Sequence, residues 1–386
     1  MHTLSTIKNP SSIGKIFVKD LMLIIILLVV IEVAVRIVAP QNLNTLLRYV
    51  YEPVNKYNGY QFIPGAQTVC NNGFGDHLFY INAWRCRDRD YGPKQSAEMR
   101  ILCVGDSFSE NQALPVEQIY PNILEAQLAN KYPGRVFSVI NAGMAGWDLW
   151  AFYDYIREML PVIKADVVVL AVGVSSSAVA SSERPVIPKI KILAGLPVRA
   201  EASAAQRLSW GIWFAGETLE SYSHAYIAFR RITYYPSLWL KIGKVPLFHP
   251  MCLQQKQVDR YYEPTFSILK KIQTICSENG AQLTLLNVPH YYECIPRETW
   301  LKIQLENPDV SSLDVSRPAR FLANIAKALS IPVYDPSDEL GAASEPVYFP
   351  IFLHWNEHGN RIVANGLLRF LEEQHLLYRP QGKRIK

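Results

Sequence analysis

Ser107 and His354 are the two side chains whose types and positions could support nucleophilic chemistry. Ser107 closes the turn Gly105-Asp106-Ser107, directly behind the apolar run "ILCV", and His354 lies in "FLHWNEHGN" near the C-terminal end. A serine hydroxyl becomes a nucleophile when an imidazole accepts its proton, and the reaction also needs hydrogen-bond donors for the oxyanion that develops. This pair therefore predicts acyl transfer through a serine, provided that the fold brings the two residues together.

The elements that must position them follow from hydrophobic patterning. Short apolar runs that end in small residues predict buried parallel strands at 99–104, 136–143, 165–173, 281–289 and 331–335. Helical patterns are expected from Pro115 onward, from Asp148 to about 160, and over about 263–279, 317–329 and 357–373. This alternation predicts an α/β fold, a three-layer flavodoxin-like sandwich with a five-stranded parallel sheet.

Three small-residue turns follow the first three predicted strands: Gly105-Asp106-Ser107, Asn141-Ala142-Gly143 and Gly173-Val174-Ser175. The carboxyl ends of parallel strands meet at one edge of an open sheet, where ligands usually bind. We therefore expect Ser107, Gly143 and His354 at this edge, with the backbone N–H groups of Ser107 and Gly143 as oxyanion donors. Taken alone, such a turn most often only connects a strand to the next element. A single histidine before a helix is usually a cap or a surface residue.

These stretches resemble the blocks of the SGNH, or GDSL-type, hydrolase superfamily over most of residues 60–375. "ILCVGDSFSE" is similar to the first block, whose serine is the nucleophile, and "VINAGMAGW" to the second, whose glycine lends an oxyanion N–H. "HWNEHGNRIVANGL" is similar to the final block, whose histidine is the general base. The resemblance implies these roles for Ser107, Gly143 and His354. "EVAVRIVAP" and "INAWRCRDRDYG" also resemble membrane-anchored bacterial members.

Two positions depart from the family pattern. Ser175 stands where the third block usually offers an asparagine amide to the oxyanion, and losing one such donor typically costs about 10²–10³ in rate. Ile351 and Phe352 stand where the final block usually has an aspartate that orients the histidine. Three outcomes stay open: a Ser-His dyad with a backbone carbonyl as orienting group, a site that no longer turns over, or a carboxylate from elsewhere. The candidates for that carboxylate are Asp335, Asp338 and Glu345.

An apolar segment at residues 16–40 is long enough to cross a bilayer. Glu32 and Arg36 interrupt it and lie four residues apart, so they can pair on one helix face. Lysines before the segment favour a cytoplasmic N-terminus and therefore an extracytoplasmic main domain in a single-pass protein of the cell membrane, which is periplasmic in a Gram-negative bacterium. A cleaved signal peptide is the alternative interpretation.

The expected organisation has five parts. These are a cytoplasmic tail (1–15), a transmembrane anchor (16–40), an irregular lead-in segment (41–98), an α/β domain (99–376) with an inserted helical cap at about 183–258, and a basic tail (377–386). The aromatic residues of the cap could stack on sugar rings or form the core of the insert. They include Trp210, Trp213, Tyr234, Tyr235 and Trp239.

Composition limits the other possibilities. A net charge of +5 without a basic stripe argues against nucleic-acid binding, and no Cys/His cluster has the spacing of a metal site. Serine acyl chemistry also requires no cofactor. In an oxidising compartment Cys70 could pair with Cys86, or Cys252 with Cys294.

The sequence therefore supports three hypotheses about function. The first is an extracytoplasmic serine esterase or O-acyltransferase that acts on acyl esters, above all O-acetyl esters, of a cell-surface polysaccharide through an acyl-Ser107 intermediate. The second is a catalytically inactive SGNH-like protein that binds or assembles glycans. The third is a lipid esterase at the membrane surface.

Overall fold

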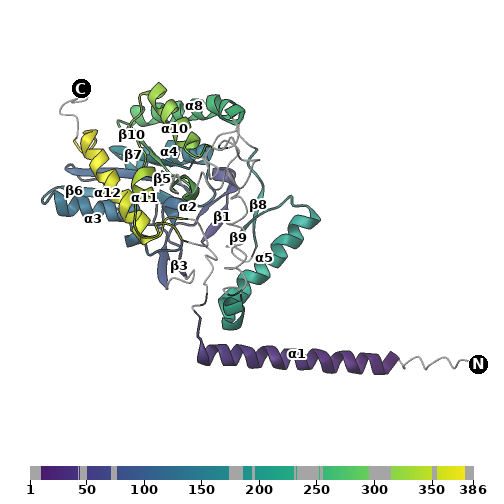
Figure 1. Cartoon of the computed structure of the whole chain (residues 1–386). Helices are drawn as coiled ribbons and strands as arrows, with labels where there is room; N and C mark the ends of the chain where they lie inside the picture. Colours follow the sequence, from purple (N-terminus) through teal and green to yellow (C-terminus); the bar gives the residue numbers. More distant parts are fainter. Residues whose placement is uncertain are drawn as a thin grey trace, which may run out of the picture.

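A five-stranded parallel sheet lies at the centre of the fold (Figure 1). The computed structural model describes residues 10–41, 43, 50–70, 76–173, 186–193, 196–229, 232, 252, 255–294, 314–349 and 354–378. The sheet strands are β5 (Glu98–Gly105), β6 (Val136–Gly143), β7 (Val167–Val172), β10 (Gln282–Asn287) and β11 (Val333–Tyr334), in the order β11-β10-β7-β5-β6. All four pairings are parallel, and this order is the flavodoxin-like one, so the predicted fold class is confirmed.

Helices cover both faces of the sheet. One face carries α4 (Leu149–Ile163), α8 (Gln255–Glu278) and α10 (Arg317–Leu329), and the other carries α3 (Tyr120–Lys131) and α12 (Glu357–Glu373). Strand β5 is buried along its whole length, with Leu102 and Val104 packed toward the first set of helices and Ile101 and Cys103 toward the second. Alternate residues of a strand point to opposite faces, which is why a strand covered on both sides is apolar throughout.

Local sequence signals explain several helix ends. Asp148 caps α4 by accepting hydrogen bonds from the backbone N–H groups of Trp150 and Ala151, as its position predicts. The helix expected from Pro115 begins instead at Tyr120, because Pro115 starts only the short 3-10 helix η2 (Val116–Gln118) and Ile119 is extended.

Helix α8 also differs from its predicted range, because it begins before the expected start at about residue 263 and contains Pro264.

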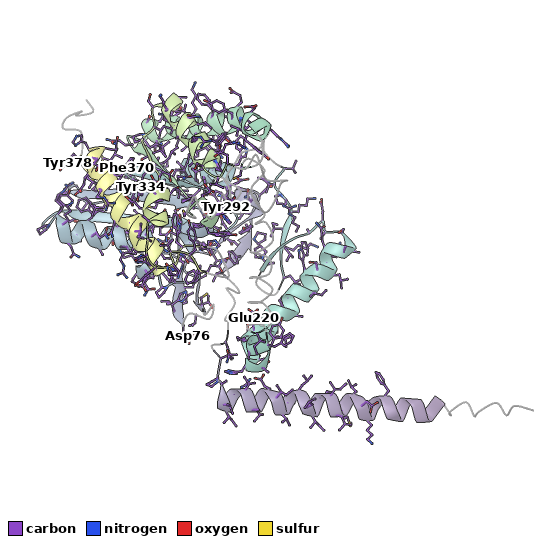
Figure 2. All side chains as sticks on the ribbon, viewed as in Figure 1. Asp76, Glu220, Tyr292, Tyr334, Phe370 and Tyr378 are labelled. Carbon is purple, nitrogen blue, oxygen red and sulfur yellow. The ribbon has the colours of Figure 1, made fainter. Side chains whose placement is uncertain are left out.

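Near the C-terminus, Tyr334 of β11 packs on Phe370 of α12 with ring centroids 5.7 Å apart (Figure 2). This contact holds the last helix against the edge strand of the sheet.

The lead-in segment is more ordered than its composition indicates. It contains two antiparallel pairs, β1 (Tyr51–Pro53) with β2 (Tyr60–Phe62) and β3 (Gln67–Cys70) with β4 (His77–Tyr80), and the 3-10 turn η1 (Tyr57–Gly59). Tyr51, Phe62 and Phe79 are buried in the main core. Strands of three or four residues are too short to show a clear period, which is why the sequence pattern was that of an irregular segment.

The described part of the cap begins with a hairpin and continues as a helix. Strands β8 (Ile190–Leu193) and β9 (Leu196–Arg199) pair antiparallel, and α5 (Ala204–Tyr222) follows. Ser203 and Gln206 form a reciprocal capping box at the start of α5. The predicted cap residues Tyr234, Tyr235 and Trp239 lie outside the described residues.

Helix α1 (Pro10–Val38) stands apart from the body of the fold (Figure 1). Its stretch Phe17–Val38 has 22 residues with a mean hydropathy of 3.0, and none of its most apolar window is buried. The helix is therefore a candidate membrane span by length and composition. An apolar helix near the N-terminus fits an anchor and a signal sequence equally well by these criteria.

All six cysteines are free thiols, so neither predicted pair forms a disulfide in this structure. Cys86 Sγ lies 2.9 Å from the Tyr155 hydroxyl, and Cys70 Sγ lies 3.5 Å from the carbonyl oxygen of Gln112. Both thiols are buried among protein groups, where burial raises the pKa of each to about 12.

Candidate active site

Ser107 is the first residue of the short helix α2 (Ser107–Glu110), which begins where β5 ends. The Asp106 carboxylate caps this helix by accepting a hydrogen bond of 2.9 Å from the backbone N–H of Phe108. The neighbours of β5 in the sheet are β6 on one side and β7 on the other, so the strand order reverses here. Ser107 therefore lies at the topological switch point, where open α/β sheets usually bind their ligands.

His354 meets Ser107 at this edge. The distance from His354 Nε2 to Ser107 Oγ is 2.8 Å, although 247 residues separate them along the chain. A neutral imidazole with an unprotonated Nε2 can accept the serine proton at this distance. The structure thus brings together the two side chains that the sequence analysis selected.

Contacts around the pair hold the two loops together. The His354 ring lies on Phe108 with centroids 4.6 Å apart, and the next residue, Trp355, is fully buried against Phe108. The side-chain amide of Asn111 donates to the carbonyl oxygen of Trp355 at 2.8 Å. The loop that carries the histidine is therefore bonded directly to the end of the serine helix.

Gly143 closes β6 beside this pair, but its N–H group is already engaged. It donates to Oδ1 of Asn141 at 3.1 Å, and the next N–H, of Met144, donates to the carbonyl oxygen of Gly105 at 3.0 Å. An oxyanion would have to displace the Asn141 oxygen to receive the Gly143 N–H. Ser175, the other predicted oxyanion donor, lies outside the described residues.

The three candidates for an orienting carboxylate are Asp335, Asp338 and Glu345, and they lie in different surroundings. Asp335 accepts hydrogen bonds from Asn287 and from the backbone N–H of Ser337, at 2.9 and 3.0 Å. Asp338 lies in α11 (Ser337–Gly341), and Glu345 lines a separate cavity. Among the described residues, no hydrogen bond or ion pair joins any of these three acids to the histidine.

Two adjacent charged residues of the lead-in segment bind the backbone at the carboxyl edge of the sheet, and the sequence analysis missed their role. Arg87 is fully buried and donates to the carbonyl oxygens of Glu110, Asn111 and Leu114 at 2.5–2.6 Å. The Asp88 carboxylate accepts from the backbone N–H of Asn141 at 2.8 Å. The signal that could have revealed them is the run "RCRDRD" within the lead-in stretch that resembles the family.

His290 is a second histidine close to the pair, and the sequence analysis did not select it. It follows β10 at the same edge of the sheet, and its ring packs on Tyr292 with centroids 4.2 Å apart. Burial, and then the charge of the nearby His354, lowers the pKa of His290 to about 4, so its imidazole is neutral at pH 7. The reasoning about strand ends that selected Ser107 applies equally to this position.

The buried carboxyl group of Glu110, at the end of the serine helix, has a raised pKa that can be tested. Its buried carboxylate accepts a hydrogen bond from the backbone N–H of Ala145, and burial raises its pKa from the usual 4.5 to about 7. A folded-state pKa above the unfolded one means that the native state favours the neutral acid. This contribution to stability is present below pH 4.5 and is lost as the pH rises to 7, and its size is on the order of 3 kcal/mol.

Glu110→Gln keeps an acceptor for Ala145 but carries no charge. We therefore expect the free energy of unfolding of the variant, relative to that of the wild type, to increase from pH 5 to pH 8. Urea unfolding of both proteins at the two pH values measures the difference in free energy of unfolding. Asp88, whose pKa burial raises to about 6, is present in both proteins and cancels from the comparison. Parallel stability curves for the two proteins would contradict the prediction.

A cavity of about 870 Å³ lies between the loop after β6 and the cap. Tyr60 and Asp148 line it from the body of the fold, and Arg199, Gln206 and Trp210 line it from the cap. The Tyr60 hydroxyl donates to the carbonyl oxygen of Ala145 at 2.6 Å, so the wall of the cavity is bonded to the loop that follows Gly143. Aromatic faces with several polar groups suit a polar ring-shaped ligand.

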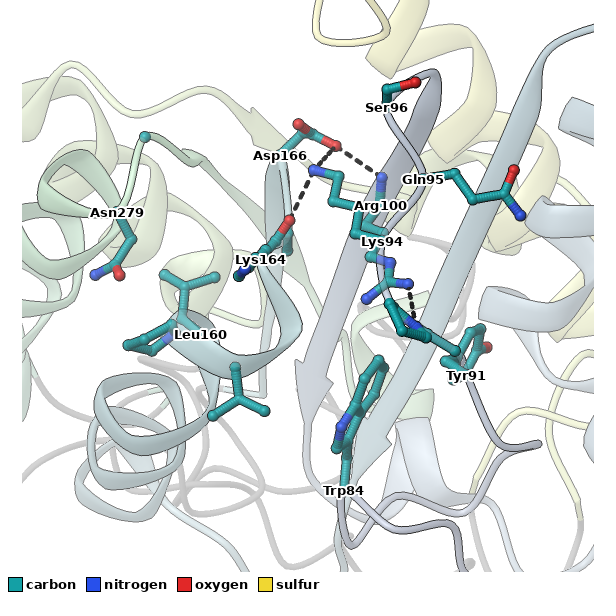
Figure 3. A pocket seen from close by; sticks show the side chains of 16 residues that line it. Trp84, Tyr91, Lys94, Gln95, Ser96, Arg100, Leu160, Lys164, Asp166 and Asn279 are labelled. Atoms are coloured by element: carbon teal, nitrogen blue, oxygen red, sulfur yellow. Dashed lines mark hydrogen bonds and ion pairs between the residues drawn. The ribbon is translucent and has the colours of Figure 1, made fainter. Parts of the chain in front are cut away.

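Another cavity, of about 970 Å³, opens near the amino ends of β5 and β7, away from Ser107 (Figure 3). Lys94 Nζ donates to Asp166 and to the carbonyl oxygen of Lys164, each at 2.7 Å, and Arg100 donates to the carbonyl oxygen of Gly92 at 2.6 Å. Lys94, Arg100 and Asp166 are thus paired with protein atoms in this cavity. It lies at the wrong edge of the sheet to serve Ser107.

No family model and no curated protein matches the chain. Among solved structures, it is similar to the crystal structure of TesA, with 14% identity, coverage of 72% of this chain and 100% of that one, and a TM-score of 0.38. It is also similar to a catalytic mutant of Axe2, an acetylxylan esterase from Geobacillus stearothermophilus, with 14% identity, 71% and 94% coverage and a TM-score of 0.39.

A third similar structure is a two-domain esterase active on acetylated mannans, with 13% identity, coverage of 75% of this chain and 53% of that one, and a TM-score of 0.40. Likenesses at this level carry no argument for function. What bears on function is the arrangement of this chain's own residues at the carboxyl edge of its sheet.

Proposed function

We propose that this protein is a serine esterase or O-acyltransferase whose nucleophile is Ser107 and whose general base is His354. The observation that carries the proposal is the distance of 2.8 Å between Ser107 Oγ and His354 Nε2 at the switch point of the sheet. A nucleophile in hydrogen-bond contact with a base is the arrangement that acyl transfer requires.

The reaction proceeds in two steps. Ser107 Oγ attacks the acyl carbon while its proton passes to His354 Nε2, and the departing alcohol takes that proton as the ester bond breaks. The resulting acyl-Ser107 is then attacked by water, which gives hydrolysis, or by an acceptor hydroxyl, which gives transfer. In both cases His354 accepts the proton of the attacking group and returns it to Ser107.

The proposed substrate is an acyl ester, above all an O-acetyl ester, of a cell-surface glycan. Its support is the cavity beside the loop after β6, where Tyr60 and Trp210 provide aromatic surface and Asp148, Arg199 and Gln206 provide polar groups. Stacking on aromatic faces with polar groups at the rim is a common way to hold a sugar ring. Helix α1 as a retained anchor would keep the domain at the membrane, on its extracytoplasmic side.

A fluorophosphonate probe tests the reactive serine directly. The full chain in detergent is expected to be labelled, and Ser107→Ala is expected to abolish labelling, because the probe requires an activated hydroxyl. Ser109→Ala is the matched control, since the hydroxyl of Ser109 is buried on the Tyr120 hydroxyl at 3.0 Å and should not react.

Release of acetate from an O-acetylated polysaccharide, compared with release of palmitate from a lipid ester, then separates the substrate classes. Labelling that survives in Ser107→Ala would overturn the proposal. A folded wild type that is not labelled at all would favour an inactive glycan-binding protein, for which the engaged Gly143 N–H is the structural argument.

A further inference from the structure

The two charged residues that interrupt the apolar helix α1 are bonded to the cap. Arg36 donates from Nη2 to the carbonyl oxygen of Tyr222, the last residue of α5, at 2.7 Å, and from Nε to Glu32 at 2.6 Å. The Glu32 carboxylate accepts from the hydroxyl of Ser223 at 2.7 Å and from the backbone N–H groups of His224 and Ala225, each at 3.0 Å.

This arrangement caps two helical segments with opposite charges. The arginine satisfies a carbonyl at the C-terminal end of α5, and the glutamate satisfies N–H groups at the start of the helical residues 224–229, as the polarity of each end favours. Removing α1 would leave both ends without these partners. The last turns of α1 are therefore part of the folded cap, which argues for a retained helix over a cleaved signal peptide.

The face of α5 that points outward is apolar. Leu208, Ile212, Leu219 and Tyr222 are 68%, 66%, 46% and 66% exposed, and spacings of four, seven and three residues place them on one side of the helix. On the opposite side of the helix, Gln206 and Trp210 line the cavity and Glu220 is buried. On a helix that faces water, polar side chains point outward and apolar ones point inward. Helix α5 has the opposite arrangement.

The position of α5 identifies what covers this stripe. Figure 1 shows α5 projecting from the body on the same side as the N-terminal part of α1, and Figure 2 shows Glu220 at the end of α5 nearest to α1, where Arg36 bonds to Tyr222. The side chains of α1 from Leu21 to Ile31 are all apolar and exposed. The stripe is thus bonded to a candidate membrane span and projects on the side where the bilayer around that span would lie.

We propose that the outward face of α5, formed by Leu208, Ile212, Leu219 and Tyr222, lies in the interface of the lipid bilayer that α1 spans. An amphipathic helix binds a bilayer through such an apolar face at the boundary between headgroups and acyl chains. The proposal rests on α1 being a retained anchor. It places the inner face of α5, with Trp210, between the membrane and the candidate substrate cavity, so the substrate would be met at the membrane surface.

Spin-label accessibility of the full chain in phosphatidylcholine–phosphatidylglycerol nanodiscs tests this placement. Nitroxide labels at Leu208→Cys and Ile212→Cys report collisions with oxygen, which partitions into lipid, and with a nickel chelate, which stays in water. Val162→Cys, on helix α4 and 54% exposed, is the matched control, and labelled wild type corrects for the six native cysteines. The oxygen-to-nickel ratio is expected to be several-fold higher at 208 and 212 than at 162.

Leu27→Cys in α1 separates the anchor from the docking of α5. A lipid signature at 27 with a water signature at 212 would overturn the docking of α5 alone. A water signature at 27 would remove the anchor and the proposal with it. Low collision rates with both reagents at 208 and 212 would show protein over the stripe, from a second copy or another segment of the chain, and would also overturn the proposal.

Discussion

Replacing His354 by alanine is expected to lower kcat for ester hydrolysis by about 10⁴–10⁶-fold, because the serine hydroxyl then has no base at hydrogen-bond distance. The KM should change little, since the imidazole contacts the nucleophile and does not line the cavity beside Trp210 that is proposed to bind the substrate. Steady-state kinetics with an aryl acetate measures both constants. The variant should also lose labelling by the fluorophosphonate probe.

A double variant makes the prediction specific to a Ser-His pair. Ser107→Ala combined with His354→Ala should be about as slow as either single variant, because groups that act as one unit do not contribute independently. His358→Ala is the matched control, since it removes an imidazole from the same segment at a position that lines a separate cavity. If His354→Ala kept more than a tenth of the wild-type kcat, or if the two effects multiplied, the dyad would be wrong.

Gly143→Ala is expected to disturb both stability and activity. A Cβ atom at this position would lie 2.3 Å from the backbone nitrogen of Glu110 and 2.5 Å from the carbonyl carbon of Ser109. These are backbone atoms of the serine helix α2, so the added methyl group must push the end of β6 and α2 apart. Overpacking of this kind typically costs about 1–3 kcal/mol.

The same displacement should lower kcat by about 10²-fold, because a shift of about 1 Å in a catalytic group has an effect of that size. Urea unfolding gives the stability and aryl acetate kinetics gives the rate. Gly92→Ala is the matched control, since a Cβ there meets no atom within 4 Å. Equal unfolding midpoints for the two variants would contradict the close approach of the two turns.

The site differs from the expected one in how its serine and histidine are supported. Of the expected carboxylates, Asp335 accepts hydrogen bonds from Asn287 and Ser337. The lead-in residues Arg87 and Asp88 instead bind the backbone of the two turns that flank the site. The carboxyl edge of the sheet is thus held by a segment that lies outside the predicted α/β domain.

The cap contributes both to the candidate substrate cavity and to the contact with α1. Its helix α5 contributes Trp210 to the candidate substrate cavity and bonds to α1 through Arg36. The fluorophosphonate probe reports only the reactivity of Ser107, and the spin-label collisions report only the contact of α5 with the membrane. A negative result in one experiment therefore leaves the other proposal standing.

The sequence by itself determined the strand and helix pattern of the α/β domain. It also indicated the turn that carries Ser107 and the choice of His354 as its candidate base. These features depend on local signals: apolar runs that end in small residues, capping residues such as Asp148, and turns at strand ends. Such signals extend over a few residues and can be read along the chain.

Only the tertiary structure decided which distant residues meet. The bond between Ser107 and His354 joins residues 247 positions apart, and the bonds from Glu32 to His224 and Ala225 join residues 192 and 193 positions apart. Contacts of this range depend on the packing of the whole chain and leave no periodic pattern in the sequence. The same reason applies to the buried Arg87, whose three carbonyl partners lie 23, 24 and 27 positions further along the chain.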